Sequence, residues 1–200
     1  MKKTIIKTVI ITLVSIILAA SLAVGIILAV SPKTIGKVFT KCGNYDAAAK
    51  LYESQYKKTE SVSDLVELVR ASIVAEDYEL TSVYGEKLTI DYKENLMYDF
   101  DSVYDDYNNY STATVEAYYK LGKIEDCVRV AFLTSDSFTV NKSLYYLFKL
   151  CDEKEDKTLA NGIYVFYKKN SSNITVSDGE GLMKKRINDY QKKYDLFYYE

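Results

Sequence analysis

The sequence predicts an all-α protein: an N-terminal transmembrane helix followed by a solenoid of antiparallel helix hairpins. Apolar residues recur at intervals of three and four along most of the chain, as they do on one face of an α-helix. The 200 residues include one proline and only eight glycines, and β-branched residues seldom alternate with polar ones. Near the N-terminus, 25 consecutive residues carry no charged side chain.

This uncharged run, residues 8–32, follows a short basic tail at residues 1–7. As a helix it would be about 37 Å long, more than the roughly 30 Å of a bilayer's hydrocarbon core. Ala19, Ala20 and Ser21 would suit cleavage by signal peptidase, but the apolar run continues well beyond them. We therefore expect an uncleaved signal-anchor that contacts the lipid bilayer, and cleavage remains the open alternative.

Lysines flank the run on both sides and nearly balance, so charge alone does not fix the orientation. They are Lys2, Lys3, Lys7, Lys33, Lys37 and Lys41. A very short basic N-terminal tail favours a cytoplasmic N-terminus. We expect a single-pass plasma-membrane protein with an extracytoplasmic C-terminal domain, and the frequent Lys, Asn, Ile and Tyr fit an AT-rich bacterial genome and a cell-envelope role.

Residues 33–200 are enough for one domain of short helices. Short helices joined by short turns pack as antiparallel neighbours, and stacked hairpins bury a continuous core. A polar loop is predicted at residues 169–179 and a C-terminal capping helix at 180–196, with Leu182, Met183, Ile187 and Tyr190 on its apolar stripe. The predicted breaks between helices fall near Gly43, Glu60, residues 89–91, Asn108–Asn109, Gly122, residues 135–137, residues 152–154 and residues 170–178.

Composition excludes several functional classes. The chain has 26 basic and 28 acidic residues, and without the three tail lysines the balance is 23 to 28. This net negative charge argues against nucleic-acid binding and against adsorption of the domain onto anionic lipid. Histidine is absent, so no histidine-dependent triad or dyad can form. No phosphate-binding glycine motif or zinc-ligand spacing occurs, and we expect no enzymatic activity, cofactor, metal or small-molecule substrate.

Three cysteines lie on apolar helical positions and are expected to be buried free thiols. They are Cys42, Cys127 and Cys151. An acidic group at residues 99–106 could suggest calcium, but its acids alternate with a helical apolar stripe and are predicted to form a solvated face. Tyrosine is abundant, at 20 residues, and serves either peptide recognition or core packing. The densest tyrosines are Tyr92, Tyr98, Tyr104, Tyr107, Tyr110, Tyr118 and Tyr119.

Residues 35–52, IGKVFTKCGNYDAAAKLY, resemble one unit of the tetratricopeptide repeat. The resemblance implies that small Gly36 and Ala48 let two helices approach closely. It also implies that Phe39 and Tyr52 fill the space between hairpins. The likeness is carried by Gly36, Phe39, Gly43, Tyr45, Ala48 and Tyr52, and it departs from the family where Glu60 replaces the usual proline.

A second copy follows 33 residues later, with Tyr78 aligned on Tyr45 and Gly85 in place of the second-helix aromatic. A third copy includes Tyr118 and has its turn at Gly122. An alternative register places that turn at Asn108–Tyr110, and the sequence leaves the two registers open.

Repeat domains of this family hold partner proteins in a concave groove. The resemblance therefore implies a membrane-anchored interaction or scaffold module that binds a protein or peptide, whose contact residues depend on the open register. One alternative is a structural subunit of a membrane complex, assembled through small residues of the transmembrane helix. Those residues are Ala19, Ala20, Ala23 and Gly25. A second alternative is a carboxylate-based hydrolase acting in a helical groove.

Overall fold

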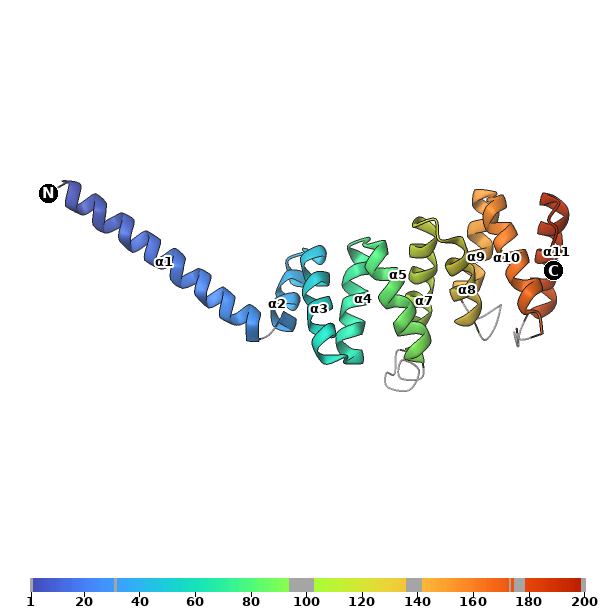
Figure 1. Ribbon diagram of the computed structural model, residues 1–200, viewed down its shortest axis with the longest axis horizontal. Helices are drawn as coiled ribbons and strands as arrows, with labels where there is room; N and C mark the ends of the chain where they lie inside the picture. Colours follow the sequence, from blue (N-terminus) through green and yellow to red (C-terminus); the bar gives the residue numbers. More distant parts are fainter. Residues whose placement is uncertain are drawn as a thin grey trace.

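The computed structural model describes residues 2–30, 32–93, 103–135, 142–172, 174 and 179–198. Within these residues all regular secondary structure is helical, which confirms the all-α prediction. Figure 1 shows a single long helix, α1, that projects from a row of shorter helices. Short turns connect most of the neighbours in this row.

The helices have the following bounds. They are α1 (Lys2–Val30), α2 (Pro32–Lys41), α3 (Tyr45–Thr59), α4 (Val62–Val74), α5 (Tyr78–Glu86) with its π-helical extension η1 (Lys87–Asp91), α7 (Val103–Lys120), α8 (Ile124–Leu133), α9 (Lys142–Lys154), α10 (Lys157–Asn170) and α11 (Glu180–Tyr194).

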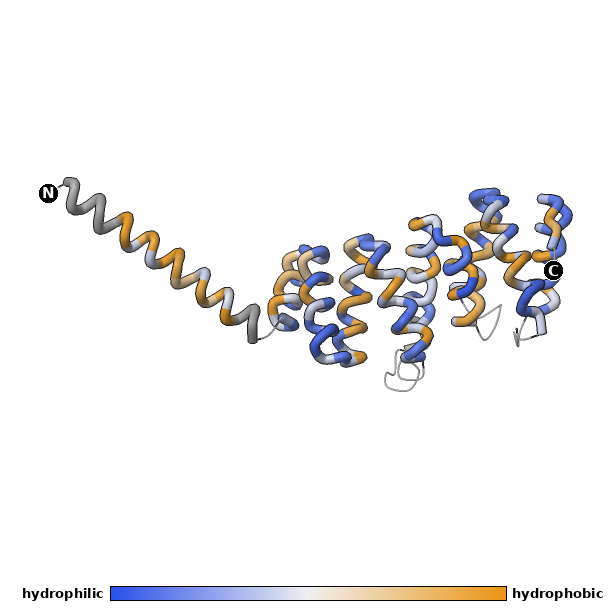
Figure 2. The backbone as a smooth tube through the Cα atoms, viewed as in Figure 1, coloured by the Kyte–Doolittle hydropathy of each residue, from blue (hydrophilic) through white to orange (hydrophobic). Residues whose placement is uncertain are grey.

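The helix α1 carries its large apolar side chains on the outside. The isoleucines, leucines and valines described between Ile10 and Ile26 are each 50–63% exposed. In Figure 2 this part of α1 is mostly orange, which marks hydrophobic residues. Among the described residues, no helix was found that combines the length and the apolar character needed to cross a membrane.

Four hairpin turns share one backbone geometry. Each contains a residue with positive φ: Gly43, Glu76, Gly122 and Glu155. In each turn the next backbone N–H donates to the carbonyl five residues earlier, over 2.9–3.3 Å, as in the Schellman motif that ends many helices. The four turns lie 33, 46 and 33 residues apart. The helix that follows is capped by a side chain in three of the four, through Asn44, Asp77 and Asp156.

These turns correct several predicted breaks. The break at Asn108–Asn109 is wrong, because both residues lie inside α7, where Tyr107 and Tyr110 hold one face in the core. The third turn is therefore at Gly122, and the register at Asn108–Tyr110 is excluded.

Four further predictions need adjustment. Residues 89–91 continue the helix as a π-helical turn, and residues 152–154 belong to α9, whose turn follows at Glu155. The last helix ends at Tyr194, and Leu182 on its predicted apolar stripe is 59% exposed. Met183, Ile187 and Tyr190 on that stripe are buried. Asn170, in the predicted loop, still belongs to α10, and residues 173 and 175–178 lie outside the described residues.

The core consists of two apolar clusters that meet at α7. The N-terminal cluster includes Tyr107 and Tyr110 of this helix, and the C-terminal cluster includes its Val115 and Tyr118. Helix α7 thus joins the two halves of the row. Helix α4 lies in the N-terminal half and contributes residues to both the core and the groove described next.

Candidate functional site

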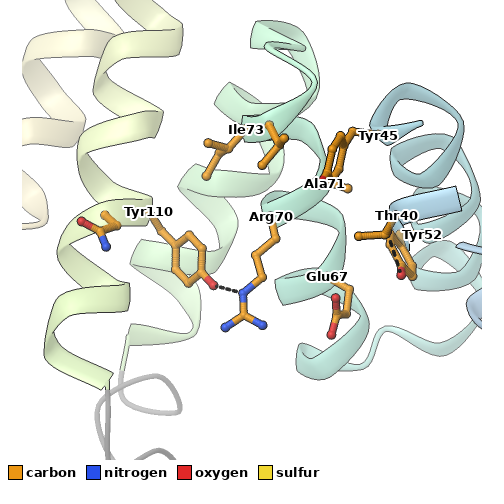
Figure 3. A pocket seen from close by; sticks show the side chains of 10 residues that line it. Thr40, Tyr45, Tyr52, Glu67, Arg70, Ala71, Ile73 and Tyr110 are labelled. Carbon is orange, nitrogen blue, oxygen red and sulfur yellow. Dashed lines mark hydrogen bonds between the residues drawn. The ribbon is translucent and has the colours of Figure 1, made fainter. Parts of the chain in front are cut away.

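A cavity of about 500 Å³ opens between α2, α3, α4 and α7 (Figure 3). It lies in the N-terminal half of the row, within two helices of the end of α1. We call this cavity the groove. It is lined by Thr40, Tyr45, Tyr52, Glu67, Arg70, Ala71, Ile73, Val74, Asn109 and Tyr110.

Helix α4 supplies the floor of the groove because its two faces differ. One face buries Leu65, Leu68 and Val69 completely in the N-terminal core. The groove-facing residues are spaced three and four apart, from Glu67 to Val74, and so share the opposite side of the helix. Val74 is 56% exposed there, so an apolar side chain is available to a molecule in the groove.

One wall of the groove is fixed by a hydrogen bond between two helices. Arg70 on α4 donates from Nε to the hydroxyl oxygen of Tyr110 on α7 over 2.7 Å, as Figure 3 shows. Tyr110 is only 4% exposed. The bond places the guanidinium beside the groove and ties the second hairpin to the third.

At the opposite end, Tyr52 lies against a glycine. A Cβ on Gly36 would come within 2.7 Å of the Tyr52 ring, so α2 presents only its backbone to this side chain of α3. The Tyr52 hydroxyl is 3.5 Å from that of Thr40. Burial raises the pKa of Tyr52, and the bond to Thr40 only partly opposes this effect. The hydroxyl is therefore neutral at physiological pH and serves as a hydrogen-bonding group.

A second cavity of about 170 Å³ shares the lining residue Ile73 with the groove. This cavity lies between the turn at Glu76 and helix α7. Its lining combines acidic, hydroxyl and apolar groups: Ile73, Glu76, Tyr78, Thr81, Ala113 and Glu116.

The structure brings together only some of the residues that the sequence singled out. Tyr45 and Tyr52 line the groove and Tyr78 lines the second cavity. Gly36 and Ala48 are buried between α2 and α3, and Phe39 packs partly buried against the same cluster. Gly43 and Gly122 occupy turns, and Tyr118 donates to Glu86; these three do not line the groove.

The sequence analysis named Tyr110 as a candidate for peptide recognition, but it did not identify Asn109 or the residues of α4 as part of a groove. Arg70 and Glu67 interrupt a stretch of buried apolar residues. This pattern indicates that one face of α4 does not pack in the core and can contact solvent or a ligand. The sequence predicted a break at residues 152–154, directly before Glu155 of the fourth turn. The spacing of this turn was not recognised, although Glu155 follows Gly122 by the same 33 residues that separate Gly43 from Glu76.

The remaining candidate residues are buried, partly buried as at Tyr92 and Tyr119, or outside the described residues. Tyr107, Tyr110 and Tyr118 are at least 93% buried. Tyr98 and the acids Asp99 and Asp101 lie outside the described residues, as do the side chains of Tyr104, Asp105 and Asp106. In the described part of the chain, no group of three or more Cys, Asp or Glu residues is arranged to hold a metal ion.

The cysteines differ in exposure. Cys42 is exposed, which corrects the expectation that all three thiols are buried, because it follows the last residue of α2 at the hairpin turn. Cys127 and Cys151 are fully buried. Burial raises the pKa of Cys127 to about 12 and that of Cys151 to about 11, so both remain protonated and unreactive thiols.

Comparisons with models of protein families, with curated proteins and with solved structures found no match for this chain.

Proposed function

We propose that this protein is a single-pass membrane protein whose helical domain binds a segment of a protein partner in the groove. The observation that carries the proposal is the groove itself. Its size, about 500 Å³, suits side chains of a bound segment, and such sites combine apolar surface with a few placed polar groups. Ile73 and Val74 supply apolar contacts, while Arg70 and Glu67 supply charge.

The anchor is part of the same proposal. The search of the described residues returned no spanning helix, but the continuity of α1 supports an anchor. This helix has 29 residues and would be about 44 Å long. Its exposed isoleucines, leucines and valines would be covered by lipid. In water, apolar surface of this extent costs roughly 25 cal/mol per Å².

The repeat likeness also belongs to the proposal. Two of the three spacings between the hairpin turns are 33 residues, close to the period of about 34 residues in tetratricopeptide repeats. Such stacked hairpins create an extended concave surface. The helices α2, α4 and α7, each the first of a pair, supply eight of the ten residues that line the groove, and α3 supplies Tyr45 and Tyr52.

The groove can be tested with two matched valines. Val74 lines the groove, whereas Val83 on α5 does not, and their exposed fractions are 56% and 57%. A photo-crosslinking amino acid at Val74 is expected to capture one recurrent partner in host membranes. The same amino acid at Val83 is expected to capture little of it. Equal capture from both positions would contradict binding in the groove.

The topology can be tested with the variant Cys42→Ser/Val83→Cys, which carries an exposed thiol on α5, where Val83 is 57% exposed. A maleimide that cannot cross membranes is expected to label this introduced thiol in intact cells if the domain is extracytoplasmic. Cys127 and Cys151 are buried and serve as internal controls. Labelling that appears only after cell lysis would place the domain in the cytoplasm, and recovery of the chain in the soluble fraction would contradict the anchor.

A further inference from the structure

The helix α2 has an outward face that combines positive charge with an exposed apolar residue. It comprises Lys37, Val38, Lys41 and, at the end of the helix, Cys42, all of which are exposed. Val38 is 55% exposed. The opposite side of α2 buries Pro32 and Gly36 against the domain. We call these four residues the basic face of α2.

The net negative charge of the whole domain does not reveal this positively charged face. The first acidic residue in the chain is Asp46, and six lysines precede it. Beyond that point, 20 basic residues stand against 28 acidic ones. Positive charge is therefore concentrated next to α1, and the acidic excess lies further along the chain.

The lysines of the face differ from their neighbour Lys33. Lys33 forms an ion pair of 2.6 Å with the buried Asp64 on α4. Among the described residues, the recorded ion pairs do not include Lys37 or Lys41. Lys33 thus holds α2 to the domain, and the two other lysines extend from the surface.

The basic face of α2 lies close to the end of α1. Only Ser31 separates α2 from α1, and in Figure 1 α2 is the first helix of the row, beside the end of α1. We propose that the basic face of α2 lies on the anionic phospholipid headgroups of the leaflet in which α1 ends. This inference rests on the proposed anchor.

The physical basis is charge complementarity at short range. A lysine close to an anionic leaflet favours the bound state about fivefold, and the attraction falls off within about one Debye length. Val38 adds an apolar contact at the boundary between headgroups and acyl chains. Because Lys33 and Asp64 tie α2 to α4, fixing α2 on the surface also fixes the orientation of the groove relative to the membrane.

The test uses the full chain with a nitroxide on Cys42, one position beyond Lys41. The chain is reconstituted into vesicles of phosphatidylcholine alone and into vesicles with roughly one third phosphatidylglycerol. Flotation reports whether the chain is in the membrane. The accessibility of the nitroxide to a water-soluble nickel chelate reports whether the face is covered.

We expect the chain to float with both kinds of vesicle and the nitroxide to be shielded only on the anionic ones. High salt is expected to restore accessibility. Replacing both lysines, K37Q/K41Q, is expected to reduce the ratio of covered to uncovered face about 30-fold. The matched pair K168Q/K169Q on α10, also exposed, is expected to leave the signal unchanged.

The outcomes separate the two proposals. Equal accessibility on both vesicles, with the chain fully floated, overturns the headgroup contact and leaves the anchor intact. Flotation with anionic vesicles only overturns the anchor and supports the basic face. Flotation with neither overturns both.

Discussion

A Cβ on Gly85 would overlap Oγ1 of Thr114, so α5 and α7 meet at a point that has no room for a side chain. Thr114 is buried and donates its hydroxyl to the carbonyl of Tyr110 over 2.8 Å. Its branched Cβ has few alternative rotamers. The contact joins the second and third hairpins, and it explains why glycine occupies the position where the repeat resemblance anticipated an aromatic residue.

Gly85→Ala is expected to lower the free energy of unfolding by about 1–3 kcal/mol, because the added methyl overpacks this contact. Thr114→Ala removes the obstructing oxygen, so the double variant is expected to lose less than the sum of the two single losses. Urea denaturation in detergent micelles measures this cycle. Gly181→Ala on α11, where a Cβ meets open space, is the control, and additive losses would show that Thr114 is not the obstacle.

The turn at Glu76 is expected to gain stability from glycine. Glu76 has φ 55°, a left-handed conformation that costs an L-residue about 1 kcal/mol. Glu76→Gly is therefore expected to raise the free energy of unfolding by about 0.5–1 kcal/mol. Gly122→Ala, with φ 70° at the equivalent turn, is expected to lower it by a similar amount. Thermal unfolding of the two variants checks both signs, and a loss in Glu76→Gly would contradict the strain.

Asp64 of α4 is expected to make the contact between α4 and the first hairpin, α2 and α3, sensitive to acid. It is 3% exposed and accepts hydrogen bonds from Lys33, Thr59 and Gln55. Burial alone would raise the pKa of Asp64, but these donors outweigh it and the pKa is lowered. The carboxylate therefore contributes stability above about pH 4, the unfolded pKa, and this contribution is lost as pH falls through the folded pKa.

Asp64→Asn is accordingly expected to be less stable than the wild type by about 1–3 kcal/mol at pH 7. The difference is expected to shrink as the pH falls below about 4. Melting temperatures measured from neutral to acidic pH follow this convergence. Asp189→Asn, at an exposed position on α11, is the control, and a difference that stays constant with pH would contradict the ionised state of Asp64.

Arg129 is expected to stabilise the contact between α5 and α8. It donates two hydrogen bonds to Glu86, of 3.0 and 2.8 Å, and one of 2.9 Å to Asp126. Tyr118 of α7 donates to the same Glu86 carboxylate. Burial, followed by that carboxylate, raises the pKa of Tyr118, so its hydroxyl stays protonated.

Arg129→Lys keeps the charge but loses the paired geometry, and a cost of about 1 kcal/mol is expected because the pair is partly exposed to solvent. Chemical denaturation of Arg129→Lys, of Glu86→Gln and of the double variant measures the coupling. Lys149→Gln removes an exposed pair on α9 and is expected to cost little. Full additivity at the Arg129–Glu86 pair would show that the two side chains do not cooperate.

The helical class could be predicted from the sequence because apolar spacing is a local property of the chain. The turns at Gly43 and Gly122 could be predicted for a related reason, since glycine adopts positive φ without a Cβ penalty. The break near Glu155 was predicted, but the residue with positive φ was not, because glutamate has no local preference for that conformation. The turn is closed by the Asp156 N–H, which donates to the carbonyl of Cys151, and the Asp156 side chain caps α10.

At Asn108–Asn109 the sequence predicted a break where the structure has a continuous helix. Asparagine favours turns in isolation because its side chain bonds to nearby backbone. In the folded protein Tyr107 and Tyr110 are buried on either side, and the gain from burying them exceeds that local preference. The misplaced break left the register open and hid the part of α7 that lines the groove.

The sequence by itself determined that the chain is helical, that an uncharged apolar stretch precedes the domain, and that its lysines are concentrated before Asp46. These are properties of neighbouring residues. Only the tertiary structure decided which faces meet: it joined Arg70 to Tyr110 across 40 positions, buried Asp64 beneath Lys33, and left the groove open between α2, α3, α4 and α7. Such contacts depend on how hairpins stack, and stacking is set by long-range packing that local spacing does not encode.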